Sequence, residues 1–226
     1  MPATANPYSS SVGKKILMAL TGAMLFGFVF VHMVGNLKIY QGPAKFDAYA
    51  HFLREVGYPA LGHGQLLWIA RIVLLGCVLV HMLAALQLTL ASWRARRKGY
   101  VRRNDLSFSY ASRTMRWGGV VILAFVVFHV LHLTTGTVHP GFSLESPYLN
   151  VITAFKFWPA ALAYILAMAP LCLHIYHGMW SVTQSLSLQH PAITRWRRLA
   201  AGLVAGAIFL GNVSVPFSIW LGWVRL

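Results

Sequence analysis

The chain has 226 residues, of which 58% are hydrophobic and only 10% are charged. A soluble domain carries about 25% charged residues, so the composition excludes an ordinary water-soluble protein and favours a membrane protein. The net charge of +15 comes from short basic clusters between apolar segments. That distribution is typical of membrane topology signals and argues against a nucleic-acid-binding function.

Five apolar segments, taken in chain order, are each long enough to cross a bilayer, which needs about 20 apolar residues. The first is too long for the core of a signal peptide, so we expect it to be retained. In the last segment, Gly202 and Gly206 predict a close helix–helix contact. The sequence predicts one all-α integral membrane domain over 1–226, with transmembrane helices at about 14–38, 64–94, 114–138, 153–187 and 197–223.

Residues 43–59, PAKFDAYAHFLREVGYP, separate the first two apolar segments. Apolar and polar side chains alternate there at helical spacing, and a proline stands at each end. This pattern predicts a short amphipathic helix that lies on the membrane surface. Residues 94–107 form a basic loop, while 139–150 read as an almost uncharged loop rich in turn residues.

Lys and Arg are divided unevenly between the two ends of these segments. The N-terminus and the connections after the second and fourth segments hold thirteen of the nineteen. Because positively charged loops stay in the cytoplasm, we expect a cytoplasmic N-terminus and a C-terminus on the outer side. An acidic soluble subunit or anionic lipid headgroups would complement the basic face.

Six of the ten histidines lie inside the apolar segments, where an ionisable residue is costly and by default indicates function. Neutral imidazole is also a common ligand of haem iron. At 1.5 Å per residue, His32 lies about 25 Å past the basic N-terminus and His129 about 20 Å past the second basic connection, so both fall toward the outer side. The same measure puts His81 near the middle or in the inner half and His174 in the inner half.

These depths predict an outer pair, His32 with His129, and an inner pair, His81 with His174, and each pair could hold one haem between two helices. The fifth segment has no histidine, so we expect four helices to form a haem-holding bundle and the fifth to pack outside it. Small residues that would let a porphyrin approach stand nearby: Gly22, Gly27, Gly35, Gly76, Gly118, Gly119 and Gly178. The alternative is that such histidines are structural, hydrogen-bonded residues.

The remaining polar and aromatic candidates have ordinary explanations. We expect four histidines in loops or at interfaces to lie at the surface: His51, His63, His139 and His190. Two cysteines inside apolar segments, Cys77 and Cys172, cannot form a disulfide framework and are expected to be small core residues. Aromatic residues near segment ends, such as Trp93, Trp117 and Tyr148, are typical interface anchors.

Several motifs together resemble the dihaem cytochrome b subunit of succinate dehydrogenases and fumarate reductases, the type with a single membrane anchor and two haems. They are SSSVGKKILMALTG at the start, FVHMVGNL around His32, AKFDAYAHFL in the first connection, LVHMLAALQL around His81, VVFHVLHLT around His129 and LHIYHGMWS around His174. Their order and separation cover nearly the whole chain, with 49, 48 and 45 residues between successive ligand candidates.

The resemblance implies a membrane anchor of succinate:quinone oxidoreductase, respiratory complex II, which links the tricarboxylic acid cycle to electron transport. It implies two haem b groups and a quinone substrate, menaquinone or ubiquinone. A flavoprotein subunit and an iron–sulfur subunit would dock on the cytoplasmic face of a bacterial inner membrane. The chain would then be catalytic only within this complex. The sequence is also compatible with a higher oligomer of the complex.

The resemblance also implies which histidines bind each haem. In the family the first and third membrane histidines bind the outer haem, and the second and fourth bind the inner haem. In the family the third ligand lies ten residues after a glycine, here Gly119, which selects His129. The fourth lies four residues before a Gly-apolar-aromatic triplet that begins here at Gly178, which selects His174.

Each selected ligand has a second histidine three residues later on the same helix face. His132 and His177 are therefore candidates for hydrogen-bonding a ligand, contacting a haem propionate or lining a quinone site. The chain departs from some fumarate reductases at Cys172, where they carry a glutamate linked to transmembrane proton transfer. That departure puts such a proton route in doubt.

Two other functions fit parts of this pattern. A cytochrome b anchor of a hydrogenase or formate dehydrogenase would share haem and quinone but have different soluble partners. A haem-free transporter would use its membrane histidines for protons or packing.

Overall fold

The computed structural model describes residues 10–95, 110–185 and 191–226, and these contain helices and no strand. Five helices are long and apolar enough to cross a membrane, which confirms the predicted all-α, multi-pass class. They are α1 (Ser11–Asn36), α3 (Gln65–Arg94), α4 (Tyr110–Leu133), α6 (Trp158–Ser185) and α7 (Pro191–Trp220). Three short helices complete the fold: the 3-10 helix η2 (Leu37–Gln41), α2 (Pro43–Glu55) and α5 (Pro147–Lys156).

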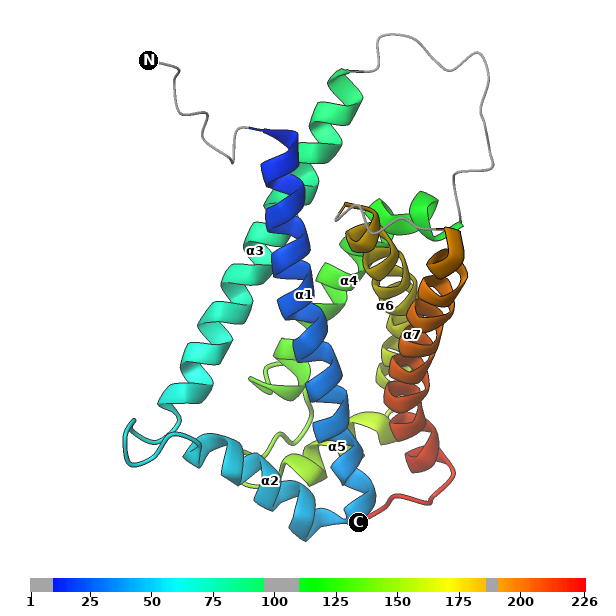
Figure 1. The fold of residues 1–226 in the computed structure, drawn as a ribbon. Coiled ribbons are helices and arrows are strands. Elements are labelled where there is room, and N and C mark those ends of the chain that lie inside the picture. The colour runs from blue at the N-terminus through cyan, green and yellow to red at the C-terminus, as the bar shows by residue number, and fades with distance from the viewer. Residues whose placement is uncertain (1–9, 96–109, 186–190) are drawn as a thin grey trace.

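The spanning helices form two layers. Helix α1 packs along α3, while α6 packs against both α4 and α7 (Figure 1). Helix α7 makes smaller contacts with α1. One layer is therefore α1 with α3, and the other is α4, α6 and α7.

The short helices and the C-terminus gather at one end of the molecule, opposite the start of α1 (Figure 1). Helix α2 contacts α5, and α5 contacts the ends of α6 and α7. A large part of the buried core lies here, formed by residues such as Ile39, Phe46, Ile152, Phe155 and Ile219. This end is consequently a closely packed part of the described chain.

Asp47 connects the two short helices at this end. One carboxylate oxygen accepts a hydrogen bond from the backbone N–H of Tyr148 at 2.8 Å, and the other accepts from the Ser146 hydroxyl at 2.9 Å. Burial, and to a smaller extent the Asp47 charge, raise the pKa of the Tyr148 phenol. The phenol stays protonated and donates to the Arg225 carbonyl at 2.9 Å. Tyr148 is thus a buried core residue and does not anchor the protein in the membrane interface as predicted.

Two predicted helices end earlier in the structure than the sequence indicated. The predicted helix at 43–59 ends at Glu55, because Gly57 adopts a left-handed φ of 98°. The helix predicted to reach 138 ends at Leu133, and the chain turns at Gly136 with φ 73°. Glycine tolerates this left-handed region without the steric cost that a Cβ imposes.

The fourth apolar segment is not one helix from 153. Helix α5 begins at Pro147 with Ser146 as its N-cap, and α6 begins separately at Trp158. Phe157 between them has an extended backbone. The end of the loop predicted at 139–150 is therefore already helical.

Candidate functional site

The two histidine pairs predicted from depth each come together in the structure. The ring centroids of His32 and His129 lie 5.7 Å apart, and those of His81 and His174 lie 6.1 Å apart. The first pair joins α1 to α4, and the second joins α3 to α6. Each pair thus bridges the two layers of the fold, although the closest helix packing is within a layer.

The two pairs lie at separate levels along the helices. His81 contacts α1 at Met18 and Thr21, whereas His32 stands eleven residues beyond Thr21 on the same helix, a rise of about 16 Å. On α6, Tyr164 contacts His129, and His174 follows ten residues later, a rise of about 15 Å. Two helices from different layers therefore give the same vertical separation.

The spacing within each pair fits a haem with two axial histidines. An imidazole nitrogen ligates a first-row transition metal at about 2 Å, so two imidazoles on opposite sides of one iron have ring centroids about 6 Å apart. The observed 5.7 and 6.1 Å match this geometry. The porphyrin itself provides the other four nitrogens, so two protein ligands per site are sufficient.

Hydrogen bonds hold the ring of one histidine in each pair. His81 Nδ1 lies 3.1 Å from the Met18 carbonyl and 3.3 Å from the Thr21 hydroxyl. His129 Nδ1 lies 3.2 Å from the Tyr164 hydroxyl. Metal-binding histidines usually donate one ring N–H to such an oxygen and use the other nitrogen for the metal. Both rings therefore keep Nε2 for a ligand.

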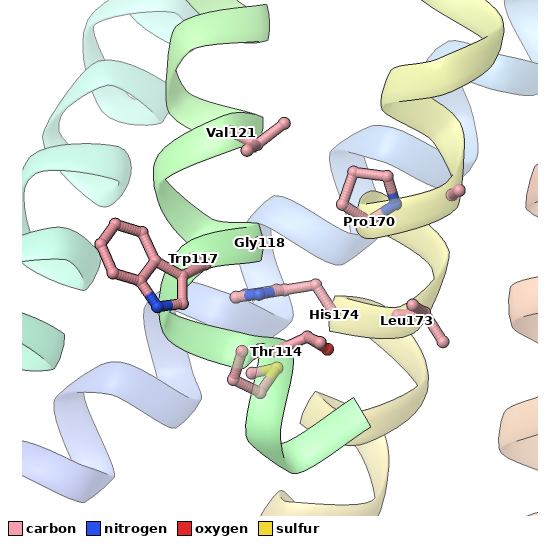
Figure 2. Close-up of a pocket in the computed structure, with 9 residues that line it drawn as sticks. Thr114, Trp117, Gly118, Val121, Pro170, Leu173 and His174 are labelled. Atoms are coloured by element: carbon pink, nitrogen blue, oxygen red, sulfur yellow. The ribbon is translucent and has the colours of Figure 1, made fainter. Parts of the chain in front are cut away.

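Glycine makes room for the inner pair. A Cβ on Gly22 of α1 would lie 3.2 Å from Cε1 of His81. On the other layer, a cavity of about 320 Å³ opens between α4 and α6, with Gly118, Pro170 and His174 among its lining residues. In Figure 2 the His174 side chain extends from α6 toward Gly118 on α4. His174 Nδ1 is buried without a hydrogen-bond partner in the described part of the chain.

The second histidines on α4 and α6 have different surroundings. His132 is only 3% exposed, stacks on Phe128 and lies 3.2 Å through Nδ1 from the Tyr164 hydroxyl. It does not face His32 as His129 does. His177 is half-buried, one turn beyond His174.

Of the four histidines expected at the surface, two are exposed, one is buried and one lies outside the described residues. His51 and His63 are exposed, as predicted, and His63 pairs with Glu55. His139 is buried, so that prediction is wrong: its Nε2 donates to the Asn150 carbonyl at 2.9 Å, and its ring lies 5.0 Å from that of His132. His190 lies outside the described residues.

Two further predictions concern small residues. Cys77 is a buried free thiol and Cys172 is half-buried. The contact expected at Gly202 and Gly206 is absent from the described chain, because a Cβ at either position would meet nothing within 4 Å. Ala201 and Ala205, one residue earlier, form the buried face of α7 instead.

Tyr164 is the site residue that sequence reasoning missed. It is buried on α6 and contacts both histidines of α4. No local motif marks it, because its partners stand more than thirty residues away in the chain.

Comparison of the chain with protein-family models, with curated proteins and with solved structures finds no match.

Proposed function

We propose that this protein is the membrane anchor and electron-transfer subunit of a succinate:quinone oxidoreductase. In this proposal two b haems lie in the bundle, one between His32 and His129 and the other between His81 and His174. By holding these haems, the protein would connect a cytoplasmic iron–sulfur subunit to a membrane quinone in electron transfer. The observation that carries the proposal is the pairing of four histidines across two layers at two levels.

The residues of the chain provide binding and orientation. The paired imidazoles would hold the iron of each haem, and Gly22 lets the His81 ring lie close to α1. Bound haem supplies reversible one-electron transfer, at a potential set by its axial ligands and their hydrogen bonds. The apolar helices around the pairs exclude water from the site.

Support for the soluble partners comes from the sequence alone. The motif order resembles the dihaem anchors of succinate dehydrogenases, whose flavoprotein and iron–sulfur subunits carry the succinate chemistry. The basic end of the molecule, with clusters near Arg94 and Arg197, offers charge complementarity to an acidic partner. The proposal includes a bacterial inner membrane, as the resemblance implies, and a cytoplasmic N-terminus, as the positive-inside rule predicts.

The haem part is tested on the purified complex. A reduced-minus-oxidised visible spectrum should show a b-type band, and haem extraction should give two haems per chain. Absence of this band from the complex would exclude the two proposed haems and favour a haem-free transporter.

The enzyme part is tested separately. Affinity purification through this chain should recover a flavoprotein and an iron–sulfur protein, and the preparation should transfer electrons from succinate to a quinone analogue. Recovery of a hydrogenase or formate dehydrogenase subunit, with two haems still present, would replace the succinate assignment and leave the haem sites unchanged.

A further inference from the structure

Tyr164 occupies a rigid position between two helices. Its ring packs edge-on against Phe125 of α4 and Phe155 of α5, with centroids 5.0 and 4.9 Å away. It belongs to the core at the closely packed end of the molecule. The residue is only 8% exposed, so packing holds its ring in place and leaves little of it accessible to water.

The hydroxyl lies between two histidines of one helix face. His129 and His132 are three residues apart on α4, and each directs Nδ1 to the Tyr164 oxygen at 3.2 Å. A tyrosine hydroxyl has one hydrogen to donate. One histidine therefore accepts that hydrogen, and the other donates its own N–H to the oxygen.

Haem binding decides the direction, and this step rests on the proposed function. A neutral imidazole that ligates iron through Nε2 carries its hydrogen on Nδ1. His129 must then donate to the Tyr164 oxygen. The Tyr164 hydrogen consequently goes to His132 Nδ1, which makes His132 the Nε2–H tautomer.

We infer that Tyr164 is a positioning residue for the outer haem, acting through His129, and that His132 completes the arrangement as the acceptor. The bond from Nδ1–H to the phenol oxygen fixes the orientation of the His129 ring. It also makes the imidazole a more basic ligand, which stabilises oxidised iron and lowers the potential of the outer haem. The inner pair lacks this arrangement, because His81 uses the Met18 carbonyl and the Thr21 hydroxyl instead.

The test is Tyr164→Phe in the purified complex, which removes the hydroxyl and keeps the ring packing. Redox titration followed in the visible spectrum should show an upward shift of one haem potential and no shift of the other. Electron paramagnetic resonance of the oxidised complex should show a changed signal for the same haem. Loss of the outer haem alone would also support the positioning role.

Tyr40→Phe is the matched control, because Tyr40 donates its hydroxyl to Ser214 at the protein surface. It should leave both potentials unchanged. Two unshifted potentials in Tyr164→Phe, or equal shifts of both, would overturn the inference. Absence of haem from the unsubstituted complex would instead overturn the proposed function, so the two failures are distinguishable.

A second variant tests the same inference if the Tyr164→Phe protein does not accumulate. His132→Phe leaves His129 and Tyr164 in place and removes the acceptor of the tyrosine hydrogen. The Tyr164 oxygen then becomes a weaker acceptor, and the outer haem potential should rise by less than in a folded Tyr164→Phe. An outer potential equal to that of the unsubstituted complex would contradict the inferred direction of the hydrogen bonds.

Discussion

His129 and His132 stand one helical turn apart, yet only one of them faces the opposite layer. The His129 ring lies 5.7 Å from that of His32, while His132 stacks on Phe128 and adjoins His139. Helix periodicity alone could not separate the two, because residues at this spacing share a helix face; only the glycine spacing of the resembling family selected His129. The structural surroundings favour His129 as the outer ligand.

Replacing these two histidines singly should therefore give different results. His129→Ala should remove the outer haem, because it deletes an axial ligand, and should lower the haem content of the complex by about half. His132→Ala should keep both haems. Haem extraction and the reduced-minus-oxidised spectrum measure the difference. Loss of a haem in His132→Ala, with retention in His129→Ala, would reverse the ligand assignment.

Gly22 provides a second comparison at the residue scale. A side chain there crowds the His81 ring, because a Cβ alone would lie 3.2 Å from Cε1 and a larger side chain would extend beyond it. Gly22→Val should displace His81 and cost the inner haem. Gly202→Val on α7 is the control, since a Cβ at Gly202 meets nothing within 4 Å and α7 carries no histidine of either pair. Equal haem content in the two variants would show that the His81 ring tolerates the displacement.

Some residue-scale features could not be predicted from the sequence. His139 follows a helix end in a turn-rich segment, where exposure is the usual expectation, but the carbonyl of Asn150 in α5 accepts its hydrogen bond inside the fold. Tyr164 resembles any aromatic residue of an apolar helix until α4 and α6 are packed together. In both cases the decisive partner comes from another helix.

At the scale of elements, hydropathy located the five spanning helices but concealed a break. The apolar run continues through Phe155 and Phe157, so α5 and α6 looked like one helix. The signals of the break were local: Ser146 before Pro147 is a helix start, and Pro159 is tolerated in a first turn. The ends of α2 and α4 depend similarly on single glycines with left-handed backbones.

The connection between α2 and α5 is testable through Asp47. Asp47→Ala removes the acceptor for both the Tyr148 N–H and the Ser146 hydroxyl. Bonds to a charged group contribute more than neutral ones, so we expect a loss of about 2 kcal/mol in the free energy of unfolding. Thermal unfolding of the detergent-solubilised protein measures it. Glu145→Ala, at an exposed carboxylate next to Ser146, is the control and should change stability by less than 0.5 kcal/mol, roughly the range of surface substitutions.

On the scale of the whole molecule, two layers meet through side chains from four helices. The histidine pairs join α1 to α4 and α3 to α6, so neither layer contains a complete pair. Loop charge gives the direction in which each helix crosses the membrane, and helix rise gives the depth of each histidine. Both can be obtained from the sequence, so the pairing could be predicted from it. They could not predict that α7 would pack closely against α6, or that a large core would lie at the end holding α2 and α5.

The structure also places chain segments at common ends, which makes the membrane orientation testable without haem. Arg54 contacts the Leu144 carbonyl, and the Tyr148 hydroxyl contacts the carbonyl of Arg225. The first and third connections and the C-terminus therefore share one end. Since this end carries few positive charges, the positive-inside rule predicts that it faces outward.

A cysteine introduced at each end tests this orientation. Leu144→Cys lies at the predicted outer end and Trp196→Cys at the basic end, and both native side chains are exposed. In spheroplasts with an intact inner membrane, a membrane-impermeant maleimide should label Leu144→Cys. It should leave Trp196→Cys unlabelled until the inner membrane is opened. The native cysteines, Cys77 and Cys172, are replaced by alanine to remove background. Labelling of Trp196→Cys alone in intact spheroplasts would contradict the predicted topology. The basic end, which is the proposed docking face for the iron–sulfur subunit, would then lie outside the cytoplasm.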